Sequence, residues 1–135
     1  MKSNDRNIKK ALVIEDEPVI ARVCRRVLRG EGYQVEIAAN GMVGKNMASK
    51  EKYDLFLSDI RTPEMNGIEF YWYLKREYPE LAERVVFTTG DVLSDDVKAF
   101  VMKEPDVPLI PKPFTPDELR TIVREMMEKT GVPVA

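Results

Sequence analysis

The feature of this sequence that most constrains its fold is a strict alternation of short apolar runs with longer amphipathic stretches. The runs fit buried strands and the longer stretches have helical periodicity. We expect strands at Lys10–Ile14, Tyr33–Ala39, Asp54–Asp59, Arg84–Gly90 and Val107–Pro111. We expect five helices: Pro18 to about Arg29, Gly41 to about Lys52, Ile68–Tyr78, one starting after Ser94, and one from Thr115 to about Lys129. Strands separated by such helices predict right-handed crossovers and a parallel sheet that is covered on both faces.

Helix-start signals support these boundaries. Ser94 precedes two aspartates and is predicted to be an N-cap. Thr115 and Glu118 have the spacing of a capping box. Asn66 and Gly67 are interpreted as a plain turn before the third helix. Polar residues alternate with apolar ones in the second strand, which predicts that this strand lies at an edge of the sheet.

Composition bounds the class of protein. The chain has 135 residues, which predicts one domain at 10–130, with tails at 1–9 and 131–135. Its net charge of −2 gives no basic character for nucleic-acid binding. It has no histidine, which excludes Ser-His and Cys-His nucleophile pairs, and its single Cys24 is expected in the core. No membrane span and no signal-peptide core is recognisable, so the expected location is the cytoplasm.

Polar residues follow the predicted strands at the point where each strand ends. Glu15 and Asp16 come after the first strand, and Asp59 ends the third. Thr89 lies near the end of the fourth strand, and Lys112 follows the fifth. The carboxyl edge of an open parallel sheet holds the ligand site, so these side chains are expected to converge. Three carboxylates in one pocket cannot all stay ionised without cations.

The residue types predict phosphoryl-transfer chemistry. Oxygen donors without His or Cys suit Mg²⁺, and Mn²⁺ can substitute. Lys112 is a compact charge that can hold one phosphoryl oxygen, and the Thr89 hydroxyl can bind another. Gly90 leaves room for a phosphodonor, and one carboxylate stays free to attack. Glu17 is expected to begin the first helix rather than to bind metal.

Four motifs in order carry a family resemblance: "VIEDEP", "LFLSDIRTPEMNG", "VVFTTG" and "PLIPKPF". From about Lys10 to Lys129 the chain resembles the receiver domain of two-component response regulators. This resemblance implies a doubly wound, flavodoxin-like α/β fold with strand order 2-1-3-4-5. It also implies that Asp59 takes a phosphoryl group from a sensor histidine kinase or a histidine phosphotransfer protein, and that the domain then changes conformation to signal to a partner.

The resemblance also assigns roles to the other residues of the site. Asp16 and Asp59 match the side-chain ligands of Mg²⁺, with the backbone carbonyl of Arg61 as a third ligand. Glu15 matches the first acid of the pocket, which is often aspartate in this family. Thr89 matches the hydroxyl that moves toward the phosphoryl group. Lys112 matches the family lysine, and its bond to Pro113 resembles a cis peptide of the family.

One position departs from the family pattern. An aromatic switch residue often lies three positions before the lysine, and here that position is Leu109. The resemblance therefore leaves open how phosphorylation is reported, and whether the chain forms a phosphorylation-dependent homodimer through the helices after Ser94 and Thr115. We expect no enzymatic activity beyond slow self-dephosphorylation, and no direct contact with nucleic acid or membrane.

Three alternatives are weighed beside the receiver interpretation. A Mg²⁺-dependent aspartyl-phosphate phosphohydrolase predicts a general acid two residues after the nucleophile, where this chain has Arg61. A flavodoxin-like cofactor binder would not place "EDEP" after the first strand. A phosphorylation-independent adaptor would not keep the acids, the threonine and the lysine together.

Two surface features have less specific interpretations. The stretch "FYWY", Phe70 to Tyr73, is expected to pack a helix on the sheet, with Trp72 or Tyr73 partly exposed. The arginines of the first helix are interpreted as a solvated face, with a partner surface as the alternative.

Overall fold

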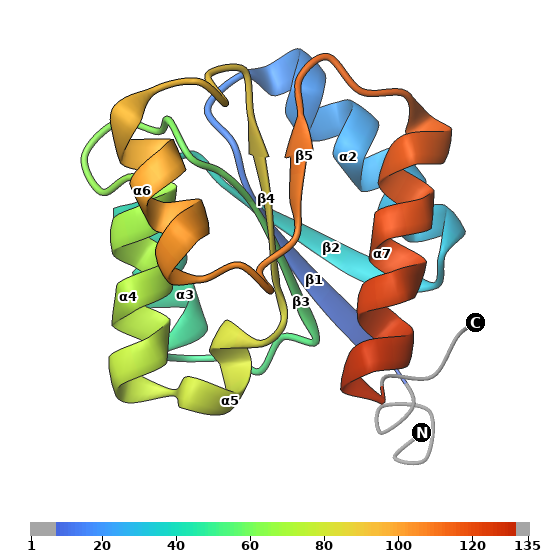
Figure 1. The fold of residues 1–135 in the computed structure, drawn as a ribbon. Coiled ribbons are helices and arrows are strands. Elements are labelled where there is room, and N and C mark those ends of the chain that lie inside the picture. The colour runs from blue at the N-terminus through green and yellow to red at the C-terminus, as the bar shows by residue number, and fades with distance from the viewer. Residues whose placement is uncertain (1–7, 132–135) are drawn as a thin grey trace.

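The computed structural model describes residues 8–131 and contains one five-stranded sheet (Figure 1). All neighbouring strands are parallel, in the order β2-β1-β3-β4-β5, as predicted. The strands are β1 (Lys9–Ile14), β2 (Tyr33–Ala38), β3 (Leu55–Asp59), β4 (Val85–Thr89) and β5 (Leu109–Pro111). The edge position predicted for β2 is confirmed. Most of the two predicted tails, 1–7 and 132–135, lies outside the described residues.

Six helices are described, one more than predicted. They are α2 (Pro18–Gly30), α3 (Gly41–Ala48), α4 (Gly67–Glu77), α5 (Pro79–Ala82), α6 (Asp95–Lys103) and α7 (Pro116–Thr130). The additional helix, α5, is a single turn that begins at the proline predicted to end the preceding helix. Proline is favoured in the first turn of a helix, where its missing N–H costs no hydrogen bond.

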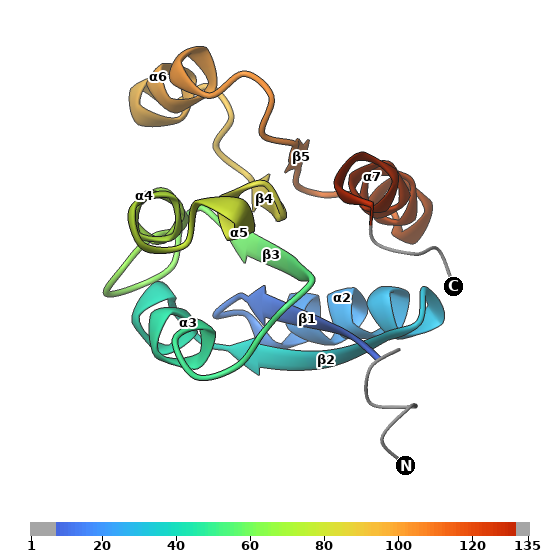
Figure 2. The same ribbon diagram turned by 90° about the horizontal axis from the view of Figure 1, so that it is seen from below.

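The helices form two layers, one on each face of the sheet (Figure 2). On one face α2 and α7 cover a core that includes Val13, Val27 and Leu57. On the other face α3, α4 and α6 cover a core with many aromatic side chains, among them Phe56 and Phe87. Every residue of β3 is buried, because it lies in the centre of the sheet with helices on both sides.

The predicted N-caps at Ser94 and Thr115 are confirmed, and Asn66, which was interpreted as a plain turn residue, is an N-cap as well. Asn66 and Thr115 each form a capping box with the glutamate three residues later. Ser94 occupies the N-cap position of α6, but its hydroxyl makes no capping bond to the backbone. It donates instead to the Asp91 carbonyl at 2.9 Å and to the Asp96 carboxylate at 2.9 Å. The Val97 backbone N–H, which a capping hydroxyl would bind, donates instead to the Asp96 carboxylate at 3.0 Å.

The register of the central strands places the carboxyl ends of β1, β3 and β4 side by side. Ile14 pairs with Ser58, so the next residues of these two strands, Glu15 and Asp59, are neighbours. Asp59 in turn pairs with Thr88. Glu15 and Asp59, which are 44 positions apart in sequence, are thereby brought to one edge of the sheet.

Candidate functional site

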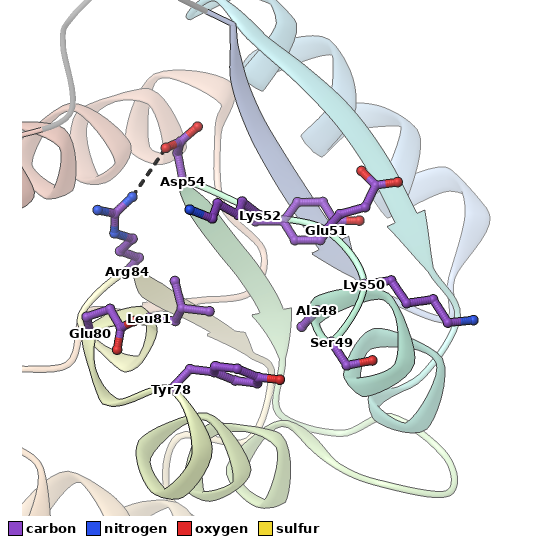
Figure 3. Close-up of a pocket in the computed structure, with 11 residues that line it drawn as sticks. Ala48, Ser49, Lys50, Glu51, Lys52, Asp54, Tyr78, Glu80, Leu81 and Arg84 are labelled. Atoms are coloured by element: carbon purple, nitrogen blue, oxygen red, sulfur yellow. Dashed lines mark hydrogen bonds and ion pairs between the residues drawn. The ribbon is translucent and has the colours of Figure 1, made fainter. Parts of the chain in front are cut away.

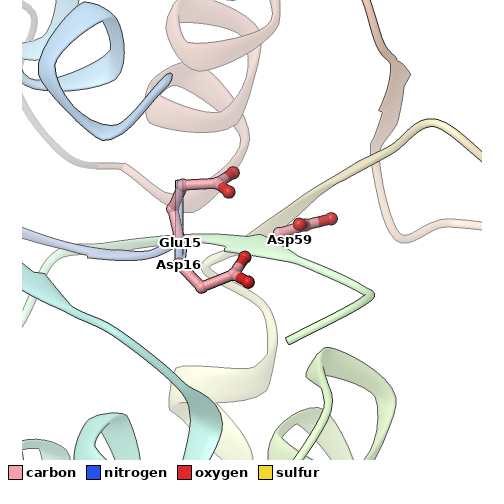
Figure 4. Close-up of side chains that lie close together, drawn as sticks. All are labelled: Glu15, Asp16 and Asp59. Carbon is pink, nitrogen blue, oxygen red and sulfur yellow. The ribbon is translucent and has the colours of Figure 1, made fainter. Parts of the chain in front are cut away.

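Three carboxylates meet at the carboxyl edge of the sheet. Glu15 and Asp16 follow β1, Asp59 ends β3, and one oxygen of each lies within 4.8 Å of the others (Figure 4). Glu15 and Asp59 are buried, at 4% and 5% exposure, whereas Asp16 is exposed. The predicted cluster of acids is thus brought together, closed on one side by the protein and open on the other.

Lys112 supplies a positive charge to this cluster. Its ammonium donates hydrogen bonds to Glu15 Oε1 and Asp59 Oδ2, both at 3.1 Å. It also lies 3.6 Å from a carboxylate oxygen of Glu17, which occupies the N-cap position of α2 as predicted. The peptide bond between Lys112 and Pro113 is cis, as the family resemblance implies. Lys112 is thus paired with the acids of the pocket.

The electrostatic balance of the site favours added positive charge. Burial raises the pKa of Asp59 above its usual range, although Lys112 and the Arg61 backbone N–H work against this rise. Burial also raises the pKa of Glu15, which the charge of Asp59 raises further. Burial by itself would lower the pKa of Lys112, but Glu15 and Asp59 outweigh it and raise that pKa. The acids therefore carry more negative charge than a single lysine offsets.

Thr89 lies at the end of β4, adjacent to the lysine segment. Its carbonyl accepts a hydrogen bond from the Lys112 backbone N–H at 2.7 Å. Its side chain is fully buried, and the hydroxyl accepts a bond from the Asp91 backbone N–H at 3.1 Å. A Cβ added at Gly90 would meet only the Lys112 Cβ, at 3.9 Å. The rim beside Thr89 is therefore open, as the sequence predicts.

The donor set fits a small, hard divalent cation. Its three oxygens come from carboxylates, and among the described residues no histidine or thiol lies in the cluster. The exposed side, next to Asp16, leaves room for the water molecules that Mg²⁺ usually keeps. Such an ion would offset the negative charge of the three carboxylates.

Two features beside Asp59 were missed by sequence reasoning. Gly67 was interpreted as a turn residue, but a Cβ there would lie 2.7 Å from the Asp59 carbonyl oxygen. Glycine at this position lets α4 begin directly against the strand that carries Asp59. The Arg61 side chain was also missed: it leaves the site and contacts Asp91, Ser94 and Asp96 across the edge of the sheet. A glycine at the start of a helix can indicate that the backbone of another element lies close to it, so the role of Gly67 had a signal in the sequence. The contacts of the Arg61 side chain had no such signal.

A cavity of about 570 Å³ lies at the opposite, amino edge of the sheet (Figure 3). Charged side chains line it, and two of them, Asp54 and Arg84, form an ion pair at 3.2 Å. The carboxylate cluster lies at the other edge, so this cavity takes no part in the site described above.

Comparison with known proteins decides the family. A model of the response regulator receiver domain matches residues 11–124. The chain belongs to this family. The transcriptional regulatory protein PcoR of Escherichia coli is 32% identical over 123 residues, which cover 90% of this chain and 53% of that protein. The probable transcriptional regulatory protein TcrX of Mycobacterium tuberculosis is 29% identical over 121 residues, covering 90% of this chain and 50% of that protein. The receiver domain thus spans about half the length of the curated relatives it matches.

Solved structures agree with this family. A CheY-like receiver domain from Methanospirillum hungatei JF-1 superposes with a TM-score of 0.82 at 27% identity, covering 92% of this chain and 97% of that one. The receiver domain of the sensor histidine kinase PA1611 from Pseudomonas aeruginosa PAO1 gives a TM-score of 0.75 at 25% identity, covering 90% and 98%. That structure contains a magnesium ion coordinated in its active-site cleft. The predicted family and flavodoxin-like fold are confirmed, and the chain is a signalling domain. None of the helices described in this receiver domain is long and apolar enough to cross a membrane.

Proposed function

We propose that Asp59 accepts a phosphoryl group from the phosphohistidine of a sensor histidine kinase or a histidine phosphotransfer protein, in a reaction that requires Mg²⁺. One observation carries this proposal: a buried carboxylate lies among further acids and bonds the ammonium of Lys112 at 3.1 Å. The same pocket offers negative oxygens for a cation and a positive group for a phosphoryl oxygen. This combination suits phosphoryl transfer, in which positioning and charge neutralisation do most of the work.

In the proposed step, a carboxylate oxygen of Asp59 bonds to phosphorus as the phosphorus–nitrogen bond of the phosphohistidine breaks. The leaving imidazole nitrogen keeps the bonding electron pair. Lys112 exchanges one of its carboxylate partners for a phosphoryl oxygen, and the Thr89 hydroxyl turns from the Asp91 N–H to donate to another. Glu15, Asp16, Asp59 and the backbone carbonyl of Arg61 would hold Mg²⁺ (or Mn²⁺), which neutralises the phosphoryl oxygens.

An apolar hollow beside the lysine supports docking of the donor protein. The hollow has a volume of about 390 Å³ and lies between the start of α2 and the segment after β5. Val19, which lines it, is 64% exposed, and Ile20 and Phe114 extend the same surface. A donor that seats an apolar side chain there brings its phosphohistidine beside Lys112, and the exposed arginines of α2 add positive charge around the contact.

The test is intact-mass spectrometry after incubation with acetyl phosphate. With Mg²⁺ we expect one added phosphate on the wild-type chain, and none after chelation of the metal or in Asp59→Asn. Asp54→Asn is the matched control, because Asp54 precedes the same strand at the opposite edge of the sheet and should leave phosphorylation intact. Phosphate retained in Asp59→Asn would contradict the assignment. Steady turnover of p-nitrophenyl phosphate would instead favour the phosphohydrolase alternative.

A further inference from the structure

One guanidinium group connects the phosphoacceptor loop to helix α6. Arg61 Nη1 and Nη2 donate to the two carboxylate oxygens of Asp96, each at 2.7 Å. Nη2 also donates to Asp91 Oδ2 at 3.1 Å and to Ser94 Oγ at 2.8 Å. Arg61 lies two residues after Asp59, and its backbone N–H is 3.3 Å from Asp59 Oδ1. The side chain of Arg61, two residues after the proposed phosphoacceptor, thus binds the β4–α6 loop and the first turn of α6.

Helix α6 has few other attachments. Of its nine residues only Val97 and Phe100 are buried. Its far end is held by Glu104, which accepts hydrogen bonds from the Tyr71 hydroxyl at 2.5 Å and from Lys75 at 2.7 Å, both on α4. At the near end Arg61 binds Ser94 and Asp96, and the Ser94 hydroxyl accepts no capping bond from the backbone. An element with so few buried contacts opens locally at low cost in free energy.

We propose that the bonds from Arg61 to Asp91, Ser94 and Asp96 hold the near end of α6 in place, and that phosphorylation of Asp59 breaks them. We call this set of bonds the latch. This inference rests on the proposed function of Asp59. A phosphoryl group adds about two negative charges and three acceptor oxygens next to the root of the arginine. Guanidinium binds such oxygens as a fork, just as it now binds the Asp96 carboxylate. When the side chain exchanges these partners, Asp91 and Asp96 lose their common cation and the near end of α6 is released.

The ion pair between Arg61 and Asp96 lies at the surface, where 41% and 50% of the two side chains are exposed. An exposed pair is held by little free energy, so an anion that forms a better fork with the guanidinium can replace the Asp96 carboxylate.

The chain contains its own reporter of this motion. Trp72, the single tryptophan, lies on α4 and is only partly buried. Its ring packs edge-on against Phe100 of α6, with centroids 5.8 Å apart, and Lys103 of α6 lies 6.0 Å from the same ring. Release of α6 changes both contacts, so tryptophan emission follows the position of the helix.

The experiment measures hydrogen exchange of residues 91–103 and Trp72 emission, with and without beryllofluoride, a mimic of the acyl phosphate. Mg²⁺ alone is the reference condition. In the wild type, Mg²⁺ with beryllofluoride should speed exchange about fivefold, the change expected for loss of a well-formed exposed ion pair. Arg61→Gln should show this faster exchange from the start and respond no further. Asp95→Asn is the matched control in the same turn, because Asp95 has no recorded contact with Arg61, and it should behave as wild type.

Two results would overturn the latch. One is unchanged exchange and emission in a wild-type sample whose beryllofluoride binding is verified by fluorine NMR. The other is an Arg61→Gln variant that responds as the wild type does. Failure of the proposed function looks different: acetyl phosphate then adds no mass to the wild type, whatever the exchange of α6. In that case the faster exchange of Arg61→Gln would show a static clamp without a phosphorylation switch.

Discussion

Replacing the proposed phosphoacceptor, Asp59→Asn, should stabilise the metal-free domain at neutral pH. At an effective dielectric constant of about 20, two charges 4.8 Å apart repel by about 3.5 kcal/mol, and Glu15 lies within that distance of Asp59. The exposed Asp16 is better screened and adds about 1 kcal/mol of repulsion. Lys112 lies 3.1 Å from Asp59, and the attraction between these two charges stabilises the folded state by about 5 kcal/mol.

These Coulombic contributions nearly cancel, so the cost of burying the Asp59 charge decides whether Asp59→Asn raises or lowers the free energy of unfolding. Taking a carboxylate out of water costs several kcal/mol, whereas a neutral amide costs less. The raised pKa of Asp59 has the same cause. Because Asn also keeps a similar shape, we expect Asp59→Asn to increase the free energy of unfolding by about 1–2 kcal/mol at pH 7.

The pH dependence has a definite sign. The pKa of Asp59 is higher in the folded than in the unfolded state, so the folded state binds more protons and wild-type stability falls as pH rises through that pKa. The burial-raised pKa of Glu15 acts in the same direction. At pH 3.5, below the unfolded pKa values of about 3.9 for Asp and 4.3 for Glu, both carboxyl groups are mostly protonated in either state. The advantage of Asp59→Asn over the wild type should therefore be present at pH 7 and largely lost at pH 3.5.

The assay is urea denaturation of both proteins in EDTA at these two pH values, repeated with Mg²⁺ at pH 7. Mg²⁺ at ten times its dissociation constant should stabilise the wild type by about 1.4 kcal/mol, and the variant by less. Asp106→Asn is the control, because Asp106 is exposed and its substitution should change stability by less than about 0.5 kcal/mol. A variant that is no more stable than the wild type at pH 7, or equally favoured at pH 3.5, would refute this account of the pocket.

Two further predictions concern packing. A Cβ at Gly41 would lie 2.2 Å from the Met65 carbonyl oxygen, so Gly41→Ala should lower the free energy of unfolding by about 3 kcal/mol or more. Gly30→Ala, with no atom within 4 Å, is the matched control and should be neutral or stabilising by up to about 1 kcal/mol in the same melts; equal effects would contradict the geometry. Burial raises the pKa of the Cys24 thiol to about 12, so iodoacetamide at pH 8 should label it only in the unfolded chain; native labelling at the unfolded rate would contradict this burial.

Most of the fold follows from the sequence because strands and helices differ in length and period. The missing helix, α5, is a single turn, which is too short to show a period. Helix α3 was predicted to reach Lys52 but ends at Ala48. Ser49, the C-cap residue, is only a moderate helix former, but Lys50, Glu51 and Lys52 are good ones, so the local signal to stop the helix is weak. Tertiary contacts stop it instead: Tyr53 is buried against Phe56, and Glu51 pairs with Lys10.

Part of the candidate site could likewise be predicted from the sequence, and part could not. Glu15, Asp16, Asp59 and Lys112 could be assembled from the sequence, because strand ends in a parallel sheet share one edge. The side chain of Arg61 could not, because its partners lie 30 or more residues away in a loop whose path the sequence does not specify.

Both cations that flank the proposed phosphoacceptor are already paired with carboxylates in this structure. Lys112 binds Glu15 and Asp59, and Arg61 binds Asp96. A phosphoryl group on Asp59 would therefore exchange ion pairs rather than add them, and the free energies of the old and new pairs largely offset each other. Two conformations separated by so small a difference are what a reversible switch requires. The proposed exchange at Arg61 would give this chain a route from the proposed phosphoacceptor to α6 that does not need an aromatic side chain at position 109.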